Sequence, residues 1–256
     1  MGILAHRHLI FYRTYADLKA ESERTYLGII WWVLEPVINM AVYYFVFSTL
    51  LNRGEPDFAP FLLIGLVAWR WFESTIKRGC QIVLASKALI LQTDLPKAIF
   101  PITGLLVNTF KFIIAFSCLL IFLWLYGFHP GAGDWARLPV VIVVQFLLLA
   151  GVALPLAAVV PFVPDLFEFV QYGLRLLFFM SGIFYDIGRI APQYAFLEYM
   201  NPVAFLISCY RDILMDGAPL HYGYLGMWSA VSVGLTFFGL IVFRRLDPIY
   251  AKRMVK

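Results

Sequence analysis

The stretch SKALILQTDLPKAIFP, residues Ser86–Pro101, lies between two apolar runs that are each long enough to cross a membrane, yet it cannot cross one itself. It carries three charged residues and two prolines. A membrane span needs about 20 mostly apolar residues, and charged side chains within it are costly. The stretch therefore predicts a short helix at the membrane surface, ended by Pro96.

The composition outside this stretch indicates a membrane protein with several spans. Hydrophobic residues make up 62% of the 256 positions, charged residues only 14%, and the mean hydropathy is +0.81, which excludes an ordinary soluble domain. No linker divides the chain, so we expect an all-α membrane protein with a single domain over residues 1–256. Six spans are predicted: Ile29–Leu51, Pro60–Cys80, Phe100–Tyr126, Leu138–Val160, Phe169–Ile187 and Tyr222–Phe243.

The two ends of the chain are more polar. Residues 1–28 precede the first span, and within them Leu9–Tyr26 mixes charges with aromatic and aliphatic residues, which predicts an amphipathic helix in the membrane interface, with basic side chains toward anionic lipid. A solvated, partly disordered tail is the alternative. Residues 244–256 form a basic tail, and residues 29–243 hold the bundle.

The distribution of Lys and Arg predicts the orientation. These residues concentrate in the N-terminal segment, around Ser86–Pro101 and in the C-terminal tail, while the opposite side holds few. Cytoplasmic loops carry the excess of positive charge, so both termini and Ser86–Pro101 are expected in the cytoplasm. The net charge of +4 thus reflects topology and gives no support for nucleic-acid binding.

The segment Gly188–His221 differs from the other outer loops. Its run Val203–Met215 has apolar residues at helical spacing. We expect a pair of short re-entrant helices in the outer half of the bundle, capped near Asn201 and ended by Asp216–Gly217. An ordinary extracellular loop is the alternative.

Several ionisable residues fall inside predicted spans, where such groups are functional candidates. Structural pairing is the alternative, and Arg70 and Glu73 are close enough to pair along one helix. In the first span Trp32, Glu35, Asn39 and Tyr43 share one helical stripe. In the fifth span a broad face is predicted to hold Arg175, Phe178, Phe179, Gly182, Tyr185 and Asp186; the ionisable candidates are Glu35, Arg70, Glu73, Lys111, Arg175 and Asp186.

Enzyme and metal motifs are mostly absent. There is no GxxxxGK[ST] phosphate loop, HExxH or GxSxG, and the three cysteines are scattered. His6 and His8 could chelate a metal, but a solvated interfacial helix explains them more simply. We therefore expect no catalytic residue, metal or cofactor on this chain.

Four motifs resemble those of one transporter family. They are LGIIWWVLEP (Leu27–Pro36), LPKAIFP (Leu95–Pro101), FFMSGIFYDI (Phe178–Ile187) and NPVAFLISCYRDIL (Asn201–Leu214). Their order and topological places resemble the permease subunits of polysaccharide-exporting ABC-2 transporters, over nearly the whole chain.

The resemblance implies a homodimeric permease in the bacterial inner membrane. It would bind two copies of a separate ABC ATPase, which carries ATP and Mg²⁺, and move a lipid-linked polysaccharide such as capsule or O-antigen outward. Periplasmic export proteins are possible further partners, beside membrane lipid.

The resemblance also implies roles for particular residues. The segment between the second and third spans would be the coupling helix that contacts the ATPase, and the helices before the last span would close the outer mouth. We expect ATPase coupling at Leu89, Leu91, Thr93, Asp94, Leu95 and Pro96. The translocation path would include Trp32, Glu35, Tyr43, Trp69, Arg70, Glu73, Arg175, Phe179 and Tyr185, and the outer gate Asn201, Pro202, Tyr210 and Arg211.

Two alternatives stay open. A membrane-embedded enzyme acting on polyprenyl-linked sugars would use Glu35, Glu73 or Asp186 as acid or base. An ABC-2 permease for teichoic acid, lipid or drug would share the architecture.

Overall fold

The computed structural model describes residues 6–50, 57–92, 95–187 and 196–255, and within them every regular element is helical, as predicted. The elements are α1 (Arg7–Glu23), α2 (Ile30–Tyr44) with a π-helical continuation (Phe45–Leu50), α3 (Phe58–Ala85), α4 (Lys87–Gln92), α5 (Ile99–Tyr126), α6 (Ala132–Val159), α7 (Asp165–Met180), α9 (Phe196–Met200), α10 (Pro202–Arg211) with a π-helical end (Asp212–Asp216), and α11 (Tyr222–Val255).

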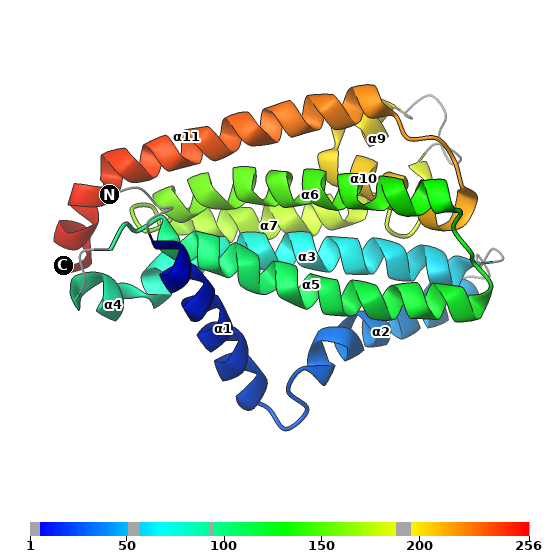
Figure 1. Cartoon of the computed structure of the whole chain (residues 1–256), viewed down its shortest axis with the longest axis horizontal. Helices are drawn as coiled ribbons and strands as arrows, with labels where there is room; N and C mark the ends of the chain where they lie inside the picture. The colour runs from blue at the N-terminus through cyan, green and yellow to red at the C-terminus, as the bar shows by residue number, and fades with distance from the viewer. Residues whose placement is uncertain (1–5, 51–56, 93–94, 188–195, 256) are drawn as a thin grey trace.

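The long helices α3, α5, α6, α7 and α11 lie side by side and alternate in direction (Figure 1). Helix α3 occupies the centre, where it packs against α2, α5, α6, α7 and α10. Most of its residues are buried, among them Trp71, which stacks on Phe112 of α5 with ring centroids 4.0 Å apart. By contrast, α2 and α7 each bury a single residue, so their outer faces are largely uncovered.

Close contact between α6 and α11 depends on glycine. A Cβ on Gly239 of α11 would lie 2.8 Å from Pro155 Cδ and 2.9 Å from Leu154 Cβ on α6, and one on Gly151 of α6 would lie 2.7 Å from the Ser232 carbonyl oxygen. Small residues at such positions let membrane helices approach closely. Pro155 itself lies inside α6, where a neighbouring helix covers the distorted turn.

Four helices among the described residues are long and apolar enough to cross a membrane, judged by length and composition. They are Ile30–Phe47, Ile99–Tyr126, Ala132–Val159 and Tyr222–Leu246. The other two predicted spans correspond to α3, which carries four charged residues between Arg70 and Arg78, and to α7, which has 16 residues. The count of six spans therefore stays a prediction.

The predicted fifth span, Phe169–Ile187, is wrong in its boundaries. The helix α7 begins at Asp165 and ends at Met180, because Gly182 adopts a left-handed backbone with φ of 63° and turns the chain. Tyr185 and Asp186 therefore follow the helix and do not share its face.

The two short helices predicted before the last span are present as α9 and α10. The Asn201 side chain accepts hydrogen bonds from the Val203 and Ala204 amides and caps α10, and Gly217, with φ of 62°, ends its π-helical continuation. Helix α10 is buried along most of its length. Residues 188–195 of the predicted outer segment lie outside the described residues.

One end of the bundle collects α4 and both termini of the chain (Figure 1). A short helix is present within Ser86–Pro101 as α4, Lys87–Gln92, which ends before the predicted stop at Pro96. From this end α1 slants away from the bundle and joins α2 at an elbow, where Gly28 has φ of 48°. The N-terminal segment is thus a helix, and it packs against α5. Its apolar side chains are spread around the helix and do not gather on one face, so the predicted amphipathic character is wrong.

Candidate functional site

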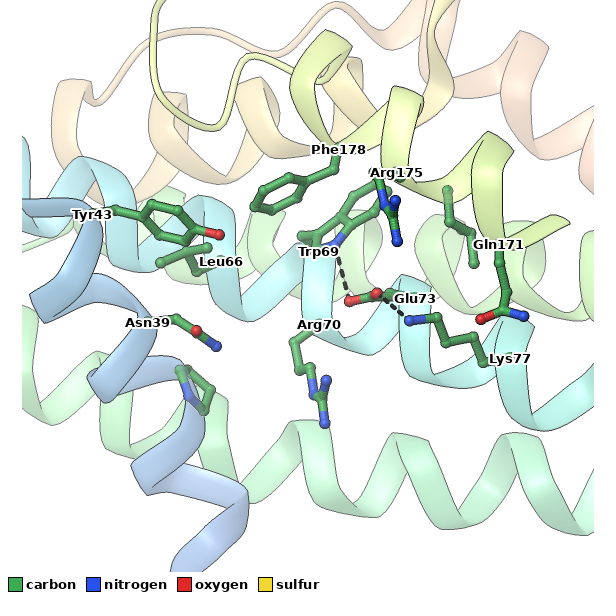
Figure 2. Close-up of a pocket in the computed structure, with 12 residues that line it drawn as sticks. Asn39, Tyr43, Leu66, Trp69, Arg70, Glu73, Lys77, Gln171, Arg175 and Phe178 are labelled. Carbon is green, nitrogen blue, oxygen red and sulfur yellow. Dashed lines mark hydrogen bonds and ion pairs between the residues drawn. The ribbon is translucent and has the colours of Figure 1, made fainter. Parts of the chain in front are cut away.

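A cavity of about 300 Å³ lies between α2, α3 and α7, on the side of the bundle where the outer faces of α2 and α7 are uncovered (Figure 2). Three faces contribute polar and aromatic side chains. The lining residues are Pro36, Asn39 and Tyr43 from α2, Leu66, Trp69, Arg70, Glu73 and Lys77 from α3, and Gln171, Leu174, Arg175 and Phe178 from α7.

Two ion pairs fix the charged groups of the cavity. Arg70 Nη2 lies 2.6 Å from Glu35 Oε2 on α2, and Lys77 Nζ lies 2.6 Å from Glu73 Oε1. The expected pairing of Arg70 with Glu73 along α3 is therefore wrong. Glu73 instead pairs one turn further along, in the favourable order of acid before base, while Arg70 reaches across to α2.

Trp69 and Phe178 form the aromatic part of the cavity wall. Their ring centroids are 5.3 Å apart, and the Trp69 indole N–H donates to Glu73 Oε2 over 3.2 Å (Figure 2). Phe178 also meets Tyr43 at 6.0 Å. Trp69 is only 4% exposed and supports the wall from behind, while the half-buried rings of Phe178 and Tyr43 present apolar faces beside hydrogen-bonding groups, which is a surface that suits sugar rings.

Arg175 adds a positive charge on the third side, pointing from α7 into the cavity (Figure 2). It lies beside the Tyr172 ring, 5.8 Å from its centroid. The charged lining residues are three cations, Arg70, Lys77 and Arg175, and one acid, Glu73. Glu35, the partner of Arg70, lies just outside the lining and adds a second acid. The cavity as a whole carries one excess positive charge.

Five of the nine residues predicted for the translocation path line this cavity: Tyr43, Trp69, Arg70, Glu73 and Arg175. Glu35 joins them through its ion pair. Trp32 lies under Lys111, 5.5 Å from ring centroid to Nζ, and is not in the lining. Phe179 is 56% exposed on the outside of α7, and Tyr185 donates from its hydroxyl to the Phe179 carbonyl over 2.8 Å.

Sequence reasoning missed Lys77 and Gln171 as lining residues. A signal existed for both, since Lys77 follows Glu73 by four positions and Gln171 precedes Arg175 by four, so each shares a helical stripe with a predicted residue. Pro36, Leu66 and Leu174 gave no signal beyond their apolar character.

Of the predicted coupling residues, Leu89 and Leu91 belong to α4, and Leu95 and Pro96 lie in the segment between α4 and α5. Leu89 is 37% exposed while its neighbour Ile90 is 4% exposed, so α4 buries one face and presents the other. Leu95 and Pro96 are half-buried. Thr93 and Asp94 lie outside the described residues, as does the side chain of Leu91. Helix α4 rests on α3 and α11, so a force on it would reach the centre of the bundle.

The predicted gate residues are anchors of α10. Tyr210 is fully buried, and its hydroxyl donates to Gln145 Oε1 over 2.7 Å, while Gln145 Nε2 donates to the Ala68 carbonyl over 3.0 Å. Asn201 Nδ2 donates to the Met180 carbonyl over 3.3 Å. Pro202 occupies the first turn of α10. None of the four lines the cavity.

Arg211 binds the turn that ends α7. Its guanidinium donates to the carbonyls of Gly182, Ile183 and Phe61 over 2.8 to 3.1 Å and lies over the Phe61 ring, 3.3 Å from the centroid. Gly65 leaves the room, because a Cβ there would lie 2.9 Å from Arg211 Nη2. A charge this deeply buried is tolerated where it satisfies several carbonyls.

Acidic residues lie near Arg211, among them Glu198, Asp212 and Asp216. Burial, together with the nearby charges of Glu198 and Asp216, raises the pKa of Asp212 to about 6. Among the described residues, no three His, Cys, Asp or Glu side chains form a group that could hold a metal ion.

Comparison with known proteins gives consistent matches. The profile of the family described as ABC-2 type transporter matches residues 13–215. The chain is 28% identical over 239 residues to the O-antigen export system permease protein RfbA of Klebsiella pneumoniae, which covers 93% of this chain and 92% of the relative. It is 26% identical over 241 residues to the protein of the same name from Myxococcus xanthus, covering 89% of this chain and 92% of the relative. It is also 24% identical over 233 residues to the polysialic acid transport protein KpsM of Escherichia coli, covering 89% of each.

Proposed function

Because this chain belongs to the ABC-2 type transporter family, we propose that it is the membrane subunit of an ATP-driven exporter of a lipid-linked polysaccharide, either O-antigen or capsular polysaccharide. The observation that carries the proposal is the similarity along nearly the whole chain to permeases named for O-antigen and polysialic acid export.

The cavity between α2, α3 and α7 supports a carbohydrate substrate. Its wall combines aromatic faces with paired charges, so it offers many weak contacts and no single tight site. Conduction of a polymer requires binding that is favourable enough for entry and weak enough for release. The nine predicted path residues are accordingly proposed to act on the polymer at or around this cavity.

We propose that the protein acts as a homodimer, and the two uncovered helices support this. Helices α2 and α7 border the cavity yet bury one residue each, so the cavity is open on the side where a second copy could complete it. We place the polymer path between two such copies.

The partner ATPase is proposed to dock on α4. The chain has no phosphate loop, and α4 presents Leu89 at the end of the bundle that holds both termini. The excess of Lys and Arg at this end favours a cytoplasmic location, with the protein in the bacterial inner membrane. Asn201, Pro202, Tyr210 and Arg211 would hold the outer helices that close the path.

The test is reconstitution of the chain with an ABC ATPase in vesicles whose outer surface corresponds to the cytoplasmic side. Lipid-linked polysaccharide is supplied in the outer leaflet of these vesicles. ATP should drive the polymer into the lumen, where it is protected from an added glycosidase. Accumulation that is equal without ATP, or absent for polysaccharides while a teichoic acid, lipid or drug is transported, would contradict the proposal.

Coupling through α4 has its own matched pair of variants. Leu89→Asp should abolish the polymer-dependent part of ATP turnover, because it replaces an exposed apolar side chain of the proposed docking helix by a charge. Gln92→Glu adds a charge to an exposed position of the same helix and should retain most activity. Equal activity of the two variants would remove α4 from the coupling route.

The enzyme alternative is less well supported. An acid or base needs a carboxyl group free to exchange a proton, whereas Glu35 and Glu73 are each held in an ion pair at 2.6 Å. Turnover of a polyprenyl-linked sugar by the purified chain without ATP would revive it.

A further inference from the structure

Glu21 of α1 lies between two cations of the bundle. One carboxylate oxygen, Oε1, accepts from Arg78 Nη1 on α3, and the other, Oε2, accepts from Lys111 Nζ on α5. Arg78 Nη2 also lies 3.3 Å from Asp17 Oδ2, one turn earlier on α1. All four side chains are partly buried. Two cations from different helices thus converge on one oxyanion.

The resident carboxylates do not use all of the donors there. Arg78 Nε is buried and has no hydrogen-bond partner. Arg13, one turn before Asp17, donates to Ser86 Oγ over 2.9 Å, and its Nε is likewise buried without a partner. Three cations face two acids, so this group has one excess positive charge. The two Nε atoms themselves are covered, because Arg13 lies over the Phe100 ring and an ideal Cβ on Gly104 of α5 would lie 3.4 Å from Arg78 Nε. A phosphate group, with more charge and more oxygens than a carboxylate, suits such a set of donors better.

Glu21 is ionised in this setting. Burial alone would raise its pKa, but the hydrogen bonds from Lys111 and Arg78 outweigh burial and hold the pKa below its ordinary value. The carboxylate therefore competes with any other anion for the two cations at neutral pH.

Few other contacts hold α1 to the bundle. Ile10 is the one buried residue of the helix, and Phe11, Tyr12 and Tyr15 are exposed. The elbow after α1 contains Gly28 in a left-handed conformation, which permits a change of direction there. The attachment of α1 consequently depends on the polar contacts at Arg13, Asp17 and Glu21 and on the stacking of Arg13 over the Phe100 ring, 4.4 Å from its centroid, so removing the Glu21 contact loosens the helix.

The position of the two cations favours a lipid as the source of the anion. Arg78 lies about two turns before the end of α3, at the end of the bundle where α1 and α4 meet. Helix α5 has 28 residues, about 42 Å, which exceeds the roughly 30 Å hydrocarbon core, so its first turns reach the headgroups. Lys111 lies about 18 Å along α5, below the headgroups, and its long side chain extends to Glu21 on α1, as lysines within a span extend toward the interface.

We propose that Arg78 and Lys111 form a binding site for the phosphate group of a membrane lipid, and that Glu21 occupies this site as an internal substitute when α1 lies against the bundle. Entry of the phosphate displaces Glu21 and releases α1 about the elbow at Gly28. Lys111 also lies over the Trp32 ring of α2, so the exchange would change the contacts of both α1 and α2, the helices on either side of the elbow. The proposal does not depend on which polymer, if any, the protein exports.

Hydrogen exchange of the full-length chain in lipid nanodiscs tests the release of α1. The bilayer is digalactosyldiacylglycerol, which has no phosphate, with or without phosphatidic acid. In the wild-type chain phosphatidic acid should speed exchange of the α1 amides about tenfold. Glu21→Gln should show the fast rate in both bilayers. Glu23→Gln, an exposed acid on the same helix whose partner is Lys19, should behave as wild type.

Retention of phosphatidic acid, measured by native mass spectrometry, separates a lipid site from a structural ion pair. Glu21→Gln should retain more lipid than wild type, because its competitor is gone, and Lys111→Gln should retain less. Fast exchange of the α1 amides in both variants, with lipid retention unchanged, would overturn the proposal. So would exchange of the wild-type α1 amides that phosphatidic acid does not speed up. A full response to inorganic phosphate in the phosphate-free bilayer would overturn the lipid as the source. No ATPase or polymer is present, so failure here leaves the export proposal standing.

Discussion

A methyl group added at Gly239 should loosen the contact between α6 and α11. The new Cβ would lie 2.8 Å from Pro155 Cδ, and 2.9 Å from both Pro155 N and Leu154 Cβ, none of which is the end of a flexible side chain. Overpacking of this kind costs about 1–3 kcal/mol. Gly234 on the same helix has nothing within 4 Å of its ideal Cβ, so Gly234→Ala is the matched control.

The comparison of the two variants removes helix propensity from the result, because each exchanges Gly for Ala inside α11. Thermal unfolding in a mild detergent, followed by circular dichroism, should give Gly239→Ala a midpoint roughly 2–12 °C below that of Gly234→Ala. Gly151→Ala, which meets the Ser232 carbonyl at 2.7 Å, should resemble Gly239→Ala. Coincident unfolding of the Gly239 and Gly234 variants would refute the close packing of these helices.

Three further outcomes are expected. Tyr210→Phe leaves the buried oxygen of Gln145 without its donor and should cost about 1–3 kcal/mol of unfolding free energy, measured by the same thermal assay. Asp212→Asn should stabilise the protein above pH 6, because the raised pKa of Asp212 means that the folded state disfavours the charged form of this carboxyl group. The gain should vanish below about pH 4, where the wild-type carboxyl group is protonated in both the folded and the unfolded state. Thermal unfolding measured at several pH values tests this. Trp69→Leu should slow export roughly two- to tenfold, because Phe178 loses the ring that supports it and Glu73 loses the indole donor, while Phe110→Leu, on the exposed side of α5, should export normally in the vesicle assay.

Elements defined by local sequence were predicted closely. The third span, expected at Phe100–Tyr126, is the helix Ile99–Tyr126, because its apolar run is uninterrupted and Gly127, with φ of 110°, ends it. The cap at Asn201 and the stop at Gly217 were likewise readable, since each depends on a residue type that favours one local conformation.

Elements defined by distant contacts were not predicted. The sequence stays apolar beyond Met180, and α7 ends there because Gly182 turns and Arg211, 29 positions away, binds the carbonyls of the turn. Similarly, the partner of Arg70 is Glu35 on another helix, whereas sequence spacing favoured Glu73. Spacing along one helix shows which pairs are possible, and only the packing of helices decides among them.

The central position of α3 has a consequence for how the protein is made. This helix is among the most deeply covered, yet its charged residues keep it out of the set of strongly apolar spans. During synthesis α3 emerges before α5 and α6, the helices that will surround it. We expect its insertion to be incomplete at that moment and to finish only when α5 follows. A chain truncated after Ala85 and followed by a polar linker long enough to clear the ribosomal exit tunnel should therefore leave α3 accessible to water-soluble labels, whereas a chain extended through Tyr126 with the same linker should protect it.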